Sequence, residues 1–114
     1  RILERVYNVS VGKTFHIASG LKIRHMLTAQ DDRLYMVCLR NLSWNRLGSV
    51  LRTLYGGRPI GSDPCLSLEY ARRIDLSSPE AGTEVEFDGD PAGYCPCRIE
   101  SAPDPLDLIV EVPA

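Results

Sequence analysis

Apolar and polar residues alternate along several short stretches of this chain. Alternation with a period of two predicts strands, because successive side chains of a strand point to opposite faces. Stretches that alternate in this way, or that are rich in β-branched and aromatic residues, are 5–11, 15–18, 21–23, 34–39, 66–70, 71–76, 83–88, 94–102 and 106–112. Short strands at regular spacing are typical of a β-sandwich or a barrel.

One stretch follows a helical period instead. The apolar residues that recur there at helical spacing are Trp44, Leu47, Val50, Leu51 and Leu54. Asn41 or Ser43 can cap the start and Gly56 is placed for a C-terminal cap, so the pattern predicts a helix over residues 43–55. We expect the apolar stripe that begins at Trp44 to face the core, because a surface helix normally buries such a stripe.

The fold class that these patterns predict is mainly β. It is a β-sandwich, or an open barrel, of short antiparallel strands with one crossing helix. A chain of 114 residues has the length of one domain and can bury a core without disulfides or metals. Its composition, 44% apolar and 25% charged, is ordinary for a globular protein. Because the chain begins at Arg1 instead of Met, we expect residues 1–114 to be a piece of a longer product or a chain that has been processed.

Charge and hydropathy argue against two classes of function. The formal net charge is −2, so there is no electrostatic case for a nucleic-acid partner. No apolar run approaches the length of about 20 residues that a membrane-spanning helix needs. The N-terminus shows no signal-peptide pattern. We therefore expect a cytoplasmic protein, with or without peripheral attachment to a membrane.

The chain has four cysteines, Cys38, Cys65, Cys95 and Cys97. In an intracellular protein the simplest expectation is that they are reduced thiols. A single residue separates Cys95 from Cys97, so a disulfide between them would close a strained ring. The sequence offers this pair no Cys or His partners at zinc-finger spacing, and metal binding by the pair is the less favoured alternative.

One predicted strand runs directly into an acidic turn. Val85 and Phe87 fall on one face of that strand and its acidic residues on the other. Asp88-Gly89 is a strong hairpin signal, since glycine tolerates positive φ and aspartate bonds to nearby backbone. The turn would deliver Asp90 to the rim of a sheet, where a carboxylate can act as a base or as a metal ligand. The alternative is a solvated hairpin without chemistry.

A second acidic cluster, Asp31 and Asp32, lies in a polar loop just before the apolar strand 34–39. Mg²⁺ binds one or two carboxylates together with carbonyl oxygens and water, and a loop entering a strand can offer both kinds of oxygen. The alternative is a solvated turn. His16 and His25 lack the spacing of a metal-binding motif, so we expect each to be a surface histidine or a strand histidine with satisfied hydrogen bonds.

Four motifs occur in an order that a known family shares. Residues 82–110 contain a strand, a turn similar to D-G-E-P, a short strand with a proline, and a closing β run. Residues 28–37 are similar to the family's A-x-x-D-D-G-L-x-x-V segment. Residues 54–58 are similar to the end of its helix, and residues 68–77 to the strand before its D-G-E strand. Taken in order along most of the chain, these motifs resemble the C-terminal part of the diacylglycerol kinase and sphingosine kinase family of lipid kinases.

The resemblance implies an enzyme that transfers the γ-phosphate of ATP to a lipid hydroxyl. At matching positions it implies that Asp90 accepts the hydroxyl proton. It also implies that a Mg²⁺ ion is held by the Asp32 carboxylate with main-chain oxygens of Ala29 and Leu34. The family's second domain is a β-sandwich, in agreement with the pattern of strands.

The family's ATP-binding element, G-G-D-G-T, does not occur in these 114 residues. The resemblance therefore implies that ATP binds through a separate α/β domain upstream. We expect the isolated chain to be inactive, and its partners to be that upstream domain and a lipid substrate at a membrane surface.

Two positions depart from the family's pattern, because Asp90 replaces a Glu and Arg33 replaces a Gly. These departures motivate an alternative, a non-catalytic lipid-binding or protein-interaction β-domain that kept the fold. A third interpretation is a structural β-domain whose resemblance is coincidental, since fold does not determine function. A truncated sandwich exposes an unpaired strand edge, which makes a homo-oligomer or pairing with a partner strand a reasonable expectation.

Overall fold

The nearly continuous apolar run at residues 34–39 forms the middle strand of the largest sheet. The structure, a computed structural model, describes residues 1–17, 20–28, 30–87 and 90–101. Strand β4 (Leu34–Arg40) pairs antiparallel with β1 (Val6–Gly12) on one side and with β5 (Leu66–Ala71) on the other. Its central position explains why the run is apolar on both faces, whereas the outer strands β1 and β5 form the edges of this sheet.

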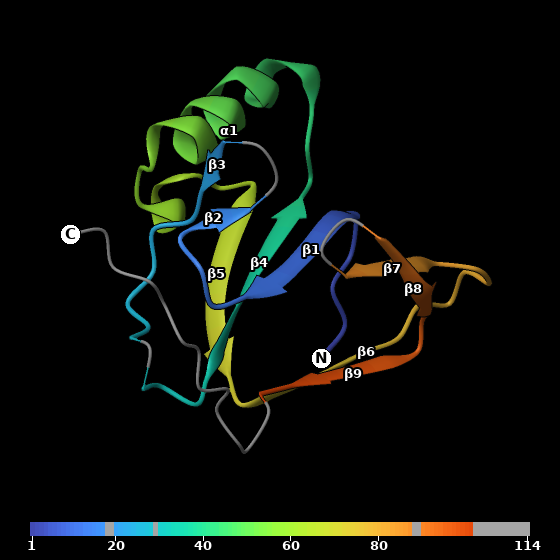
Figure 1. The fold of residues 1–114 in the computed structure, drawn as a ribbon. Helices are drawn as coiled ribbons and strands as arrows, with labels where there is room; N and C mark the ends of the chain where they lie inside the picture. The colour runs from blue at the N-terminus through green and yellow to red at the C-terminus, as the bar shows by residue number, and fades with distance from the viewer. Residues whose placement is uncertain (18–19, 29, 88–89, 102–114) are drawn as a thin grey trace.

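Three short two-stranded ribbons complete the β structure (Figure 1). They are β2 (His16–Ile17) with β3 (Leu21–Lys22), β6 (Arg73–Leu76) with β9 (Cys97–Glu100), and β7 (Glu84–Phe87) with β8 (Asp90–Tyr94). All pair antiparallel, and the sheets of the described residues do not close into a barrel. The prediction of a mainly β fold of short antiparallel strands with one crossing helix is confirmed.

Helix α1 (Trp44–Gly56) lies where the helical period predicts it, and Ser43 is its N-cap residue. The C-terminal cap is one residue later than expected, at Gly57, whose φ of 65° is in the left-handed region. A short 3₁₀ turn, η1 (Ile60–Ser62), follows and leads toward β5. No helix in the described ranges is long and apolar enough to cross a membrane.

We expect Gly57→Ala to lower the free energy of unfolding by about 1 kcal/mol, because a Cβ is strained at positive φ. Gly48 provides a matched control with the opposite sign. It lies inside the same helix, and a Cβ added there meets nothing within 4 Å. Gly48→Ala should therefore stabilise the protein by up to about 1 kcal/mol. Urea denaturation of both variants measures the difference, and equal shifts would contradict the assignment of Gly57 as the cap.

The core lies between α1, the three-stranded sheet and the loop after β3. Its buried members are Ile23, Leu27, Tyr35, Val37, Val50, Ile60, Cys65 and Leu66. His25 is also buried, stacked on Phe15 with ring centroids 4.2 Å apart, and its Nδ1 accepts a hydrogen bond from the Leu27 N–H at 3.0 Å. The imidazole thus ties the loop after β3 to the core. The expectation of a surface histidine or a satisfied strand histidine is wrong for His25, because it lies in a loop and its buried Nε2 has no hydrogen-bond partner among the described residues.

The prediction that Trp44 faces the core is wrong, since its side chain is 91% exposed. At 3.6 residues per turn, Trp44 shares a face with Leu51 and Tyr55, which are 42% and 54% exposed. The face that packs on the core carries Val50 instead. The helix therefore has a second apolar stripe, directed away from the sheet.

The strand boundaries differ from the sequence pattern at three places. Strand β8 (Asp90–Tyr94) was not expected, because proline and glycine in a short segment normally argue against a strand. The expected strand 94–102 is shorter and begins at Cys97. The expected run 71–76 is interrupted at Arg72, and the expected strand 106–112 lies outside the described residues.

Candidate functional site

The β7–β8 hairpin positions Asp90 as the sequence predicts. Phe87 and Asp90 are partners in the antiparallel register that pairs β7 with β8. The turn predicted at Asp88-Gly89 lies outside the described part of the chain. A backbone hydrogen bond of 2.8 Å from the Cys95 N–H to the Thr83 carbonyl closes the base of the hairpin. The backbone that carries Asp90 is therefore held in place by the pairing of β8 with β7.

The Asp90 side chain is open to solvent. All of β8 is exposed, and Phe87 opposite Asp90 is 73% exposed. Within the described residues, no side chain forms an ion pair or hydrogen bond with the Asp90 carboxylate. A carboxylate without a cationic partner keeps its lone pairs available to accept a proton or bind a cation.

The loop that enters β4 holds its first carboxylate differently. The Arg33 side chain donates to Asp31 Oδ1 from Nε at 3.0 Å and to Oδ2 from Nη2 at 2.8 Å, and the Arg33 backbone N–H adds a bond of 2.9 Å. These hydrogen bonds, the side-chain ones foremost, lower the pKa of Asp31 to about 2. The Arg33 guanidinium also lies over the Tyr70 ring, 5.4 Å from its centroid.

The second carboxylate of this loop is paired as well. Arg72 Nε donates to Asp32 Oδ2 at 2.7 Å, and both side chains are exposed. Lys13 Nζ bonds to the Asp31 carbonyl oxygen. Three cations thus surround the acidic loop, and both of its carboxylates are neutralised by arginine.

We expect Arg33→Gln to raise the pKa of Asp31 from about 2 toward its ordinary value of 3.8. The return is partial, because the backbone N–H of residue 33 still donates. The sign of the pH dependence follows from linkage. The lowered pKa of Asp31 stabilises the folded protein at pH values above 3.8, and this stabilisation is lost as the pH falls toward 2. An NMR titration of the Asp31 carboxyl measures this pKa. Arg72→Gln is the control and should leave it unchanged, whereas a native Asp31 that titrates at its ordinary value would contradict the pairing.

The residues expected to hold Mg²⁺ are only partly assembled. Ala29 lies outside the described residues. Leu34 is buried, and its backbone pairs with Ala71 at the start of β4. The Asp32 carboxylate faces Arg72, which supplies positive charge where a cation would bind. Within the described ranges no three His, Cys, Asp or Glu side chains form a metal-binding group. The pairing of Asp32 with Arg72 works against a Mg²⁺ ion at this carboxylate, and the site remains a prediction from the sequence.

The structure does not bring Asp90 and the acidic loop together. Figure 1 shows the β7–β8 ribbon at one side of the molecule, whereas the segment leading into β4 lies at the lower end of the three-stranded sheet. A cation at Asp32 would therefore not lie beside the Asp90 carboxylate. The two clusters are separate candidates.

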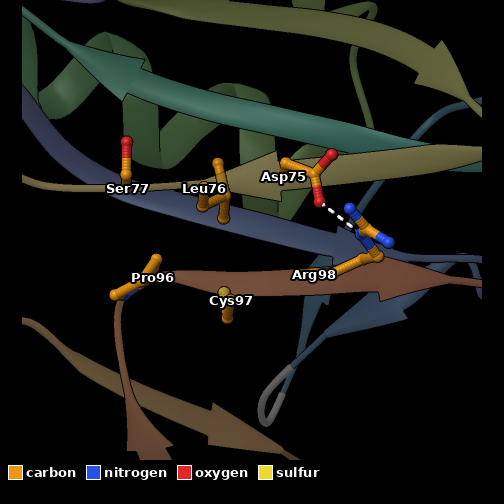
Figure 2. A pocket seen from close by; sticks show the side chains of 6 residues that line it. All are labelled: Asp75, Leu76, Ser77, Pro96, Cys97 and Arg98. Carbon is orange, nitrogen blue, oxygen red and sulfur yellow. Dashed lines mark hydrogen bonds and ion pairs between the residues drawn. The ribbon is translucent and has the colours of Figure 1, made fainter.

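A shallow hollow of about 440 Å³ lies where β6 and β9 meet (Figure 2). Figure 2 shows Asp75 bonded to Arg98, at 2.7 Å between Oδ1 and Nε. Burial, together with neighbouring Cys95, raises the pKa of the Cys97 thiol, which keeps it protonated at neutral pH. With its acid paired and its thiol protonated, this hollow lacks a reactive group.

Sequence reasoning missed the exposed stripe of α1. The signal was available in the spacing, because Trp44, Leu51 and Tyr55 are separated by seven and four residues. The sequence pattern combined Trp44 and Leu51 with Val50 in one stripe. In the structure Trp44, Leu51 and Tyr55 point to the solvent side of the helix, whereas Val50 points to the core.

Comparisons of this chain with protein-family models, with curated proteins and with solved structures found no match.

Proposed function

We propose that residues 1–114 form the lipid-side domain of an ATP-dependent lipid kinase of the diacylglycerol and sphingosine class. The observation that carries the proposal is the position of Asp90, an exposed carboxylate without a cationic partner among the described residues, held at the start of β8. The order of motifs along the chain and the mainly β fold support the same proposal. In this proposal the protein is cytoplasmic and acts at a membrane surface.

The proposed reaction uses Asp90 as a general base. As the lipid hydroxyl oxygen forms its bond to the γ-phosphorus of ATP, the bond between that phosphorus and the β–γ bridging oxygen breaks and ADP leaves. The hydroxyl proton passes to an Asp90 carboxylate oxygen. ATP and its Mg²⁺ are supplied by a separate upstream domain, since phosphoryl transfer needs positive charge around the transferred group.

The shorter side chain at position 90 sets a geometric demand on the substrate. Aspartate reaches about 1.5 Å less far than glutamate, because it has one methylene fewer. The lipid hydroxyl must therefore approach the hairpin more closely than it would approach a glutamate.

A second candidate is a non-catalytic lipid-binding or protein-interaction domain. The ion pairs Arg33–Asp31 and Arg72–Asp32 favour it, because they occupy the acidic loop with cations of the chain itself. In this case the edges that β1 and β5 form within the described residues are candidate places for a partner strand, including one from a second copy.

A comparison of the isolated chain with the natural full-length protein distinguishes the two candidate functions. We expect the isolated chain with Mg-ATP and diacylglycerol or sphingosine to form no phosphorylated lipid, and the natural full-length protein to form it. Turnover by the isolated chain that depends on Asp90 would overturn the assignment of ATP binding to another domain. Absence of turnover by the full-length protein would leave the binding domain as the better account.

A further inference from the structure

The solvent side of α1 has an apolar stripe that stays largely exposed within the described residues, although the Tyr55 ring lies beside Gly20. Trp44, Leu51 and Tyr55 form this outer stripe, and exposed Gly48 lies between the first two along the same face. Figure 1 shows α1 at the outside of the molecule, with the sheet beneath its other side. A bulky tryptophan that is 91% exposed is costly to leave in water, so the stripe is a candidate contact surface.

Unpaired cations lie beside the outer stripe. Arg52 and Arg58 line a hollow of about 480 Å³ with Gly48, and neither guanidinium forms an ion pair within the described ranges. The Lys22 side chain lies next to Gly57 at the end of the same helix, and it too is unpaired there. Five arginines elsewhere form ion pairs with Asp or Glu, at positions 1, 33, 72, 73 and 98.

Acidic groups do not offset the positive charge of Arg52, Arg58 and Lys22 on this face. Helix α1 contains no Asp or Glu in its 13 residues. Ser49, which also lines the hollow, donates its hydroxyl hydrogen bond to the buried Asp63 at 2.8 Å. The other Asp63 oxygen accepts the Cys65 N–H at 2.9 Å. Because Asp63 is buried and occupied by these two donors, Arg52 and Arg58 remain the free donors of the hollow.

We propose that the outer face of α1 docks on a bilayer that contains anionic phospholipids. The outer stripe would enter the boundary between headgroups and acyl chains, and Arg52, Arg58 and Lys22 would contact lipid phosphates. Low overall hydrophobicity, basic residues on the polar side and Trp and Leu on the other are the features of helices that lie in a membrane interface. Trp and Tyr are the residues that prefer this interface.

The observations favour a bilayer over a groove-binding protein. The outer stripe is on the solvent side of the helix, and Gly48 of that face also lines the basic hollow, so a flat surface with negative charge can meet both together. The inference rests on the proposed function for the reason why this chain would meet a bilayer. Its test measures binding alone and needs no catalysis.

Trp44 is the only tryptophan of the chain, so its fluorescence reports on this face directly. We expect vesicles of phosphatidylcholine mixed with phosphatidylserine to shift the Trp44 emission to the blue, and brominated acyl chains to quench it. Vesicles of phosphatidylcholine alone should give a much weaker response, and added salt should release the protein, because screening weakens charge attraction.

Matched pairs of variants test whether vesicle binding depends on the outer face of α1 or only on the net charge of the protein. Arg52→Gln with Arg58→Gln should weaken vesicle affinity by about 20- to 30-fold, at about fivefold per arginine. Arg72→Gln with Arg98→Gln changes the net charge equally and should leave affinity close to native. Tyr55→Ser should weaken binding, whereas Tyr7→Ser, at a tyrosine that is similarly exposed at 58% on β1, should not.

The inference is overturned if the emission of Trp44 does not respond to anionic vesicles, or if the control pair weakens binding as much as the α1 pair. A blue-shifted Trp44 without vesicles, together with a dimer in sedimentation equilibrium, would assign the outer stripe to a second copy and also overturn it. Lipid phosphorylation by the full-length protein on detergent-dispersed substrate needs no bilayer. Activity there without vesicle binding would refute docking alone, and vesicle binding without activity would refute only the proposed function.

Discussion

Replacing Asp90 by Asn is expected to lower kcat for lipid phosphorylation by the full-length protein about 10²- to 10⁴-fold. The amide cannot accept the hydroxyl proton, yet it has nearly the same shape as the carboxylate. Because β8 is exposed and Asp90 packs against no core residue, the fold should be unaffected. The KM for ATP should change little, since ATP binds to another domain in the proposal. Steady-state kinetics with Mg-ATP and lipid in detergent measures both constants.

Two further variants test whether the effect belongs to position 90. Glu86 is an exposed carboxylate on the same hairpin and is paired in register with Pro91. Glu86→Gln therefore removes a neighbouring negative charge and should leave kcat near native. Asp90→Glu extends the reach of the carboxylate by about 1.5 Å and should raise kcat. An Asp90→Asn enzyme with native kcat would remove Asp90 from the mechanism.

The largest expected effect on stability is that of Tyr35→Ala, which should lower the free energy of unfolding by about 3–5 kcal/mol. Tyr35 is 0% exposed on the central strand β4, between Gly12 of β1 and Tyr70 of β5 in register. Its ring also lies beside the buried His25, with centroids 5.0 Å apart. Truncation would leave a cavity at the centre of the core that the paired backbone of three strands cannot collapse to fill.

Urea denaturation followed by far-UV circular dichroism measures this loss. Tyr7→Ala is the matched control, because Tyr7 is on β1 and more than half exposed, and its removal should cost less than about 1 kcal/mol. Tyr35→Phe keeps the ring and should lose far less than Tyr35→Ala. A Tyr35→Ala protein as stable as the Tyr7 control would contradict the position of Tyr35 in the core.

The strongest periodic patterns of the sequence predicted the elements that the structure contains. β4 and α1 were predicted with boundaries close to those observed, because one is an apolar run and the other has helical spacing with capping residues. β8 was missed because Pro91 and Gly93 hide its strand character, and pairing with β7 overrides that local preference. The sequence pattern could not tell which stripe of α1 the sheet covers, since both stripes are apolar.

The candidate site was predicted in its local part only. The sequence predicted a hairpin before Asp90, and β7 pairs with β8 there, whereas the predicted Asp88-Gly89 turn itself lies outside the described residues. The partner of Asp32 could not be read from the sequence, because Arg72 is 40 residues away. The register of β4 with β5 brings Asp32 and Arg72 together, because Leu34 pairs with Ala71 and both side chains lie just beyond that pair. Local motifs thus predicted the carboxylates, and strand pairing determined the arginine partner of Asp32.

The most direct test of the central claim is analysis of the product formed by the full-length natural protein that contains residues 1–114. The protein is incubated with Mg-ATP labelled in the γ-phosphate and with diacylglycerol or sphingosine, and the lipid fraction is separated. The account predicts label esterified to the lipid hydroxyl, and loss of that product in the Asp90→Asn variant. Label that stays in ATP or appears only as inorganic phosphate would contradict it.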